Sequence, residues 1–255
     1  MPAVLFALLA LLPQLVDRTN EALTPPPVSA ELTAEKRADI FMARKMYREA
    51  VETYSSAING EPDSARLYNK LGIAYHHQVL FNQARKQYER AVKIDKDYAE
   101  AINNLGTVYY AQRKYKKAAK TYEKALKYAP YSASIYSNLG TAHFARRQYK
   151  KASAAYLQAL QLDPGVFEYR NSVGTVLQER SVQDRALYFY FVAKSYASIG
   201  LYDRALFHLR RALEDGYRKI KDIPKDPAFA GMLDNPEFQA LINPPAPEQR
   251  AELQP

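Results

Sequence analysis

The chain has 255 residues, enough for one or two domains with a substantial buried core. Its 47% hydrophobic and 25% charged residues argue against disorder throughout. The sequence contains no Cys, which excludes disulfides, thiolate nucleophiles and Cys-based zinc or iron–sulfur sites, and its formal net charge of +9 favours anionic partners.

The N-terminal segment contains an apolar run from Pro2 to Val16, shorter than the roughly 18 to 20 residues that span a bilayer. Its length is typical of a secretory signal peptide, so we predict a signal peptide or N-terminal anchor in residues 1–24. No Lys or Arg precedes the run and no clear cleavage site follows it, so a buried start of the fold is an alternative. The prediction implies export to the periplasm or another extracytoplasmic compartment, with the cytoplasm as the alternative. Residues 25–31, which contain three consecutive prolines, are predicted to be a linker.

Three residue types recur at steps of 34 residues between residues 32 and 216. These columns are Gly72, Gly106, Gly140 and Gly174; Ala50, Ala84, Ala118, Ala152 and Ala186; and Tyr54, Tyr88, Tyr122, Tyr156 and Tyr190. Within one unit the apolar residues have the spacing of two amphipathic helices, joined by a turn at residues 112–114. Small residues in fixed columns are expected where two helices approach to about 8–10 Å.

This pattern resembles the tetratricopeptide repeat (TPR), a helix–turn–helix unit of 34 residues. In one unit the matching residues are Leu105, Gly106, Tyr109, Tyr115, Ala118, Tyr122, Ala125 and Pro130. The resemblance covers residues 32–216 and implies an all-α fold, a right-handed superhelix of antiparallel helix pairs with about five units. The first unit carries Ala38 in place of Gly. The frame changes after Ala186, so a helix near residues 185–198 is expected to be the second helix of one unit and the first of the next.

The C-terminal region repeats the sequence Asp/Asn-Pro-x-Phe at residues 226–229 and 235–238. Two short helices that start at Pro are expected to bury Phe229, Leu233, Phe238 and Leu241, so residues 217–242 are predicted to be capping helices. Residues 243–255 are predicted to be a disordered tail.

The sequence shows no pattern that indicates catalysis. Its four histidines, His76, His77, His143 and His208, lack metal-ligand spacing, and its glycines are isolated and do not form a phosphate loop. We therefore predict that the protein is not an enzyme and uses no cofactor, metal or small-molecule substrate.

The resemblance implies that the first helix of each unit lines a concave groove that binds peptides. Asn side chains there could pair with a peptide main chain, because an amide both donates and accepts hydrogen bonds. The candidate groove residues are Asn69, His76, Asn103, Asn104, Thr107, Tyr110, Asn138, Thr141, Phe144 and Asn171. The alternative is that Asn is simply common in these columns of the family.

Lys and Arg residues cluster at two successive turns between helices and are expected to form a basic edge. They are Arg113, Lys114, Lys116 and Lys117, followed by Arg146, Arg147, Lys150 and Lys151. This edge suggests a second function, binding of an anionic membrane surface or nucleic acid, although a solvated outer face would have the same sequence. No aromatic residues alternate with these cations, which disfavours nucleic acid. The favoured prediction is a non-catalytic scaffold that binds a protein or peptide in its groove.

Overall fold

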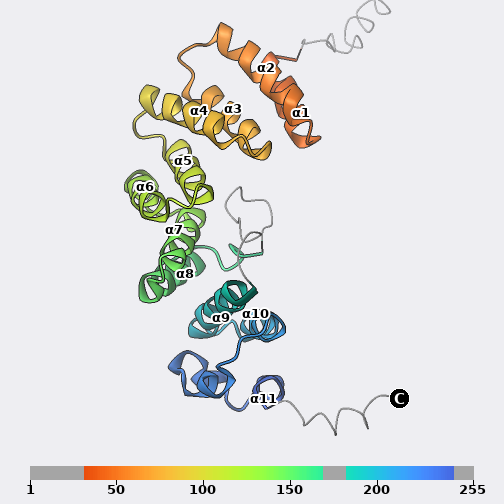
Figure 1. The fold of residues 1–255 in the computed structure, drawn as a ribbon, viewed down its shortest axis with the longest axis vertical. Helices are drawn as coiled ribbons and strands as arrows, with labels where there is room; N and C mark the ends of the chain where they lie inside the picture. Colours follow the sequence, from red (N-terminus) through yellow and green to blue (C-terminus); the bar gives the residue numbers. More distant parts are fainter. Residues whose placement is uncertain (1–31, 169–181, 244–255) are drawn as a thin grey trace, which may run out of the picture.

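This computed structural model describes residues 32–168 and 182–243, which form an elongated, curved stack of helices (Figure 1). The α-helices are α1 (Ala34–Ala43), α2 (Tyr47–Gly60), α3 (Ala65–His77), α4 (Phe81–Ile94), α5 (Ala99–Ala111), α6 (Tyr115–Tyr128), α7 (Ala133–Ala145), α8 (Tyr149–Leu162), α9 (Val182–Ser198), α10 (Tyr202–Glu214) and α11 (Pro236–Ile242). Two 3-10 helices, η1 (Ile220–Lys225) and η2 (Pro227–Met232), lie between α10 and α11. The described residues contain no strand.

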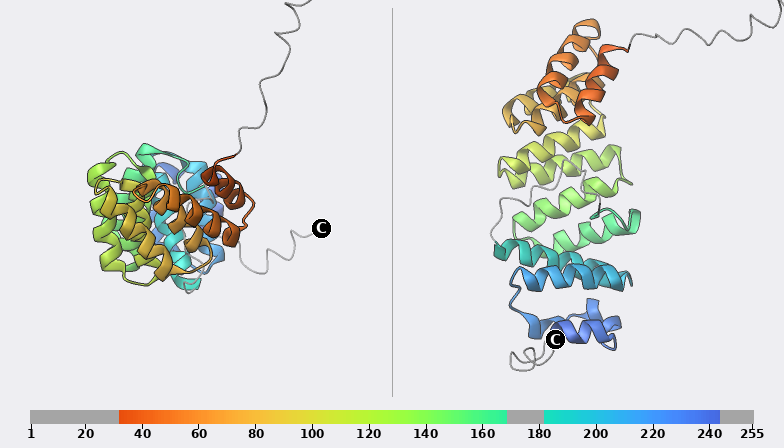
Figure 2. Two further views of the ribbon diagram at one scale, coloured as in Figure 1. Left: turned by 90° about the horizontal axis from the view of Figure 1, so that it is seen from above. Right: turned by 90° about the vertical axis from the view of Figure 1, so that its right-hand side faces the viewer.

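Successive helices pack as antiparallel pairs, α1 with α2, α3 with α4, α5 with α6, α7 with α8 and α9 with α10. The second helix of each pair also packs against the first helix of the next pair, and the first helices α3, α5 and α7 contact one another. Two further views show the pairs layered along one axis (Figure 2). The predicted all-α solenoid is therefore confirmed.

The Gly and Tyr columns meet inside each pair. A Cβ atom added to Gly106 would lie 2.6 Å from Cε1 of Tyr122, and the Tyr122 ring is only 1% exposed. The same contact recurs at Gly72 with Tyr88 and at Gly140 with Tyr156. These glycines are required because the ring occupies the space that a methyl group would need.

The turns inside the first four pairs share one left-handed residue. Lys45, Val79, Arg113 and Arg147 have φ between 58° and 61°, and Gly200 takes this conformation in the fifth pair. Their N–H groups donate back to the end of the preceding helix, as when the Arg113 N–H donates to the Tyr110 carbonyl at 2.8 Å. This hydrogen bond closes the helix end within a short connection.

Helix α9 is the first helix of the pair that it forms with α10, as predicted from the changed frame. We also expect α9 to be the partner of a helix that carries Gly174, but Gly174 lies outside the described residues. Tyr190 also departs from its column, because its ring stacks on Tyr217 at 4.4 Å and its hydroxyl donates to Asp226 at 2.9 Å. The Tyr column thus changes its contacts where the capping region begins.

The repeated Asp/Asn-Pro-x-Phe sequence starts two short helices. Asp226 accepts a hydrogen bond from the Ala228 N–H and Asn235 accepts one from the Phe238 N–H, so each acts as an N-cap before Pro. Phe229 and Phe238 are fully buried, as expected. The expectation was wrong for Leu233, which is 38% exposed because it lies just beyond the end of η2, and Leu241 is only partly buried.

Several predicted segments lie outside the described residues: the signal peptide or anchor of residues 1–24, the linker of residues 25–31 and the tail beyond residue 243. Within residues 32–168 and 182–243, no helix is both long and apolar enough to cross a membrane.

Candidate functional site

A chain of asparagine side chains links the first helices α3, α5 and α7. The Asn138 amide donates to Oδ1 of Asn103 at 3.0 Å, and Asn103 donates a weaker bond to Oδ1 of Asn104 at 3.4 Å. Asn104 in turn donates to Oδ1 of Asn69 at 3.0 Å, and Asn69 donates to Glu100 at 2.9 Å. We call this chain of four asparagines and Glu100 the amide relay.

The relay does not follow the 34-residue columns. Asn104 and Asn138 share a column, yet the hydrogen bonds join residues 35 positions apart, Asn69 with Asn104 and Asn103 with Asn138. Residues of one column project in the same direction from successive first helices, so they lie next to one another without facing each other. One residue turns an α-helix by about 100°, so the side chain that faces the next first helix comes from the neighbouring column.

The predicted groove residues are less open than expected. Asn103 is partly exposed, but the rest of the described set is buried, with at most 9% of each residue exposed: Asn69, His76, Asn104, Thr107, Tyr110, Asn138, Thr141 and Phe144. Adjacent first helices pack closely enough to join their amides, so these side chains already contact one another, and their role in peptide binding stays a prediction. Asn171 lies outside the described residues.

The Thr column points into the helix pair. Thr107 Oγ1 accepts a hydrogen bond from the Tyr122 hydroxyl at 3.2 Å, and Thr141 accepts one from Tyr156 at 3.4 Å. Ile73 occupies the equivalent position in the second pair. The Tyr88 hydroxyl is consequently buried without a hydrogen-bond partner among the described residues.

The three predicted aromatic groove residues lie at the turns of their own pairs. His76 contacts Phe81 edge-on at 5.2 Å, and Tyr110 packs at 5.2 Å against Tyr115, the first residue of the second helix in its pair. Phe144 repeats this contact with Tyr149 at 5.6 Å. In the sequence, this contact is indicated by an aromatic residue five positions after His76, Tyr110 or Phe144.

Two histidines are held in their neutral form. Burial, reinforced by the neighbouring His77, lowers the pKa of His76 to about 4. Burial and the positive charge of Arg211 lower the pKa of His208 to about 4, and its ring stacks on Tyr196 at 5.2 Å. Neither forms part of a metal site, since the described residues contain no group of three or more His, Asp or Glu arranged to hold a metal ion.

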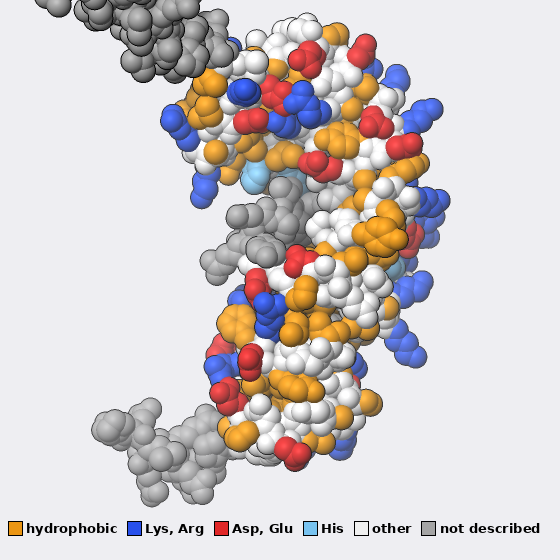
Figure 3. Space-filling model, turned by 180° about the vertical axis from the view of Figure 1, so that it is seen from behind, with side chains coloured by type: hydrophobic (Ala, Val, Ile, Leu, Met, Phe, Trp, Pro, Cys, Tyr) orange, Lys and Arg blue, Asp and Glu red, His pale blue; other side chains and the backbone are white. Residues whose placement is uncertain are grey.

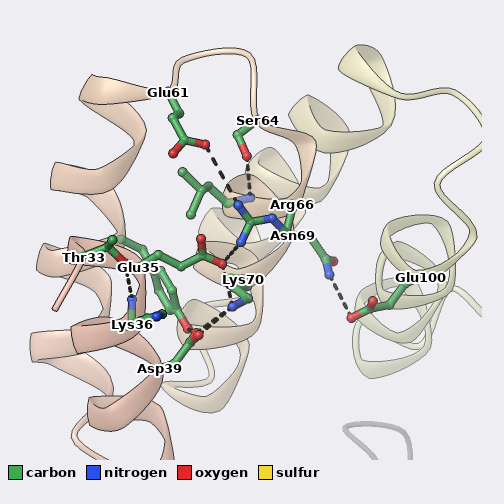
Figure 4. A network of polar contacts seen from close by, with 12 residues as sticks. Thr33, Glu35, Lys36, Asp39, Glu61, Ser64, Arg66, Asn69, Lys70 and Glu100 are labelled. Carbon is green, nitrogen blue, oxygen red and sulfur yellow. Dashed lines mark hydrogen bonds and ion pairs between the residues drawn. The ribbon is translucent and has the colours of Figure 1, made fainter. Parts of the chain in front are cut away.

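A charged network between the first two pairs lies next to the Asn69 end of the relay (Figure 4). Lys70 contacts Glu35 at 2.7 Å and both carboxylate oxygens of Asp39 at 2.7 and 2.8 Å, while Arg66 pairs with Glu35. The Tyr54 hydroxyl donates to Asp39 at 2.5 Å. Lys70 therefore holds the first helix pair against α3.

The basic edge surrounds a shallow depression of about 500 Å³ at the outside of the third and fourth pairs. Its lining residues are Arg113, Lys114, Tyr115, Lys116, Lys117, Lys120 and Arg146. Arg147, Lys150 and Lys151 follow at the next turn and at the start of α8. Figure 3 shows Lys and Arg side chains projecting along the convex edge of the stack.

Stacked helix pairs with a curved inner face define the class of helical solenoid repeat proteins. Two family models match the sequence, one described as "Tetratricopeptide repeat" over residues 103–166 and one as "TPR repeat" over residues 38–79 and 81–113. Together they cover about half of the chain, so the protein belongs to the tetratricopeptide repeat family.

Solved structures agree with this assignment at the level of the fold. A crystal structure of MamA is 22% identical, covers 72% of this chain and 96% of its own, and superposes with a TM-score of 0.50. A MamA fragment from Desulfovibrio magneticus RS-1 is 19% identical, covers 71% of this chain and 92% of its own, and has a TM-score of 0.51. No curated protein matches the sequence.

Proposed function

We propose that the protein is a non-catalytic scaffold that binds an extended peptide segment of a protein partner along α3, α5 and α7. Membership of the TPR family supports a role in protein–protein interaction. The observation that carries the proposal is the amide relay, which places four Asn side chains in hydrogen-bonding contact across three first helices.

The relay leaves hydrogen-bonding capacity for a ligand. Each Asn amide has two N–H donors and a carbonyl oxygen with two lone pairs. Asn103, Asn104 and Asn138 each donate once, whereas Asn69 donates to both Glu100 and Tyr98. A peptide main chain offers one donor and one acceptor per residue, so it complements a row of amides. Asn103 is the partly exposed member and is the first amide that a peptide would reach.

Two of the three helices that carry the relay, α5 and α7, are almost uncharged, whereas α3 carries Arg66 and Lys70, which pair with acidic residues of α1. Ala133–Ala145 contains no Asp, Glu, Lys or Arg, and Ala99–Ala111 contains only Glu100, which bonds to Asn69. Such a surface selects main-chain and apolar groups over charged ones. A partner segment of extended, largely uncharged sequence fits it best.

The test is selection of random twelve-residue peptides displayed on phage, followed by titration of the synthetic winners against the full chain. We expect Asn103→Ala to weaken these peptides at least tenfold, because the most accessible amide is lost. Lys124→Ala, on the outer helix α6, is the control and should leave affinity within twofold of the original. Circular dichroism should show that both variants remain folded.

Two results would count against the groove. One is a selection that yields no binding peptide, and the other is peptides that bind the Asn103→Ala variant as tightly as the original chain. Affinity that falls steeply with added salt would point instead to the basic edge, because screening weakens exposed charge interactions.

We also propose that the chain is exported, on the basis of its apolar segment from Pro2 to Val16. Residues 1–31 fused to alkaline phosphatase, which is active only after export, should give activity in a bacterial host. An inactive fusion that accumulates in the cytoplasm would contradict the proposal.

A further inference from the structure

We propose that the basic depression between the third and fourth pairs binds a compact anion carrying two or more phosphoryl groups. Six of its seven lining residues are cations, and the seventh is Tyr115, so no acidic residue lines it. This site lies on the outer edge, apart from the amide relay, and the inference goes beyond the peptide-binding function.

Five of the six lining cations form no ion pair with a carboxylate in the described part of the chain. None of Lys114, Lys116, Lys117, Lys120 and Arg146 forms an ion pair with a carboxylate of residues 32–168 or 182–243. By contrast, Arg66 and Lys70 in the first two helix pairs are paired with carboxylates, as Figure 4 shows. The depression therefore brings together five positive side chains that no carboxylate of the described residues pairs with.

Neutral groups hold two of these cations in place. The Lys114 ammonium donates to the Gln112 side chain at 2.9 Å, and the Lys117 ammonium lies 4.1 Å from the centre of the Tyr109 ring. A cation over an aromatic face keeps its full charge while its position is fixed. The two ammonium groups are thus positioned before any ligand arrives.

The fold does not require cations at this turn. The equivalent residues of the preceding pair are Val79, Leu80, Asn82 and Gln83, and that pair has the same helix lengths and the same left-handed residue at its turn. Because the same helix lengths and the same left-handed residue occur with uncharged side chains, charge at these four positions of the α5–α6 turn is not a packing requirement.

The cations also oppose the local helix preference. Lys116 and Lys117 lie in the first turn of α6, which has no acidic residue and no side-chain cap, at the positive end of the helix dipole. Some helices of the stack carry an acid there, including Glu49 in α2, Glu100 in α5 and Asp203 in α10, whereas α4 and α8 also lack one.

Charge density favours phosphoryl groups over carboxylates. One phosphoryl group carries about −1.5 to −2 charges near neutral pH, so two or three of them offset most of six cations. Six carboxylates on an extended peptide would span roughly 20 Å. A depression of about 500 Å³ matches the compact ligand.

The test is isothermal titration of the full chain with tripolyphosphate at constant ionic strength, with citrate as the carboxylate comparison. The variant Lys116→Glu/Lys120→Glu changes two exposed lining residues. The control, Arg218→Glu/Lys219→Glu, makes the same charge change at two exposed residues beyond α10. We expect tripolyphosphate to bind, the first variant to weaken binding at least tenfold, and the control to remain within twofold.

Sedimentation with phosphatidylcholine vesicles, with and without phosphatidylinositol bisphosphate, distinguishes the source of the phosphoryl groups. Binding to the phosphorylated vesicles that is lost in Lys116→Glu/Lys120→Glu supports a lipid headgroup. Binding of tripolyphosphate alone supports a soluble ligand. The proposal is overturned if neither probe binds, if citrate or a polyglutamate peptide binds as tightly as tripolyphosphate, or if both variants weaken binding equally.

Discussion

Replacement of Gly106 by Ala gives a direct test of how the helix pairs interlock. The new Cβ would lie 2.6 Å from Cε1 and 2.8 Å from Cδ1 of Tyr122, where ordinary contacts are 3.4 Å or more. The Tyr122 ring is buried and its hydroxyl donates to Thr107, so the ring cannot withdraw without losing this hydrogen bond.

The expected free-energy change follows from three effects. Overpacking a core costs about 1–3 kcal/mol, and loss of the Thr107 hydrogen bond costs about 1 kcal/mol. Ala is a better helix former than Gly by about 1 kcal/mol, which offsets part of this loss. We therefore expect Gly106→Ala to lower the free energy of unfolding by about 2 kcal/mol, measured by urea denaturation followed by circular dichroism.

Gly60→Ala is the matched control. Nothing lies within 4 Å of a Cβ at Gly60, which is the last residue of α2, so stability should stay equal or rise by a few tenths of a kcal/mol. Combining Gly106→Ala with Tyr122→Leu should cost less than the two single changes together, because the smaller side chain leaves room for the methyl group. A Gly106→Ala variant as stable as the original chain would refute the close-packing argument.

Three further changes test other features by the same urea measurement. Tyr88→Phe should leave stability equal or higher, since it removes an unpaired buried hydroxyl, whereas Tyr122→Phe should cost about 1 kcal/mol; equal losses would contradict this. Val79→Gly should raise the free energy of unfolding by about 1 kcal/mol, because Val79 has a left-handed φ of 61° and its side chain is 67% exposed. A loss of stability would contradict the inference that the Val79 backbone is strained. His76 and His208 have a pKa of about 4 when folded and near 6.5 when unfolded, so their stability contribution is complete above pH 6.5 and is lost as the pH falls towards 4. Each should contribute a loss of about 2 kcal/mol between pH 7 and pH 5, and a flat profile would show that the rings are not held neutral.

The helix pairs could be predicted from sequence because their determinants are local. Gly106 and Tyr122 lie 16 residues apart in one unit, and the same spacing in neighbouring units fixes the register of each pair. The short capping helices were predictable for a similar reason, since Asp226 and Asn235 each cap the turn that follows them.

The faces of the first helices were harder to predict. Helices α5 and α7 bury residues on most of their sides, so periodicity does not distinguish the side that meets the second helix from the side that faces the inside of the curve. The column of Thr107 therefore does not reveal from sequence that its side chain accepts a hydrogen bond from Tyr122. The amide relay was missed for another reason, because a 34-residue alignment places Asn104 beside Asn138, whereas contact requires neighbouring columns.

The two candidate surfaces differ in the physical property that would select a partner. The amide relay is neutral apart from Glu100 and offers directional hydrogen bonds, so its selectivity would depend on the shape and main-chain spacing of a ligand. The basic depression offers concentrated charge, so its selectivity would depend on the charge density of a ligand and on ionic strength. Because one proposed surface lies on the first helices and the other at the turn before α6, the two proposed ligands would not compete for the same residues. Occupation of one surface need not displace the ligand of the other.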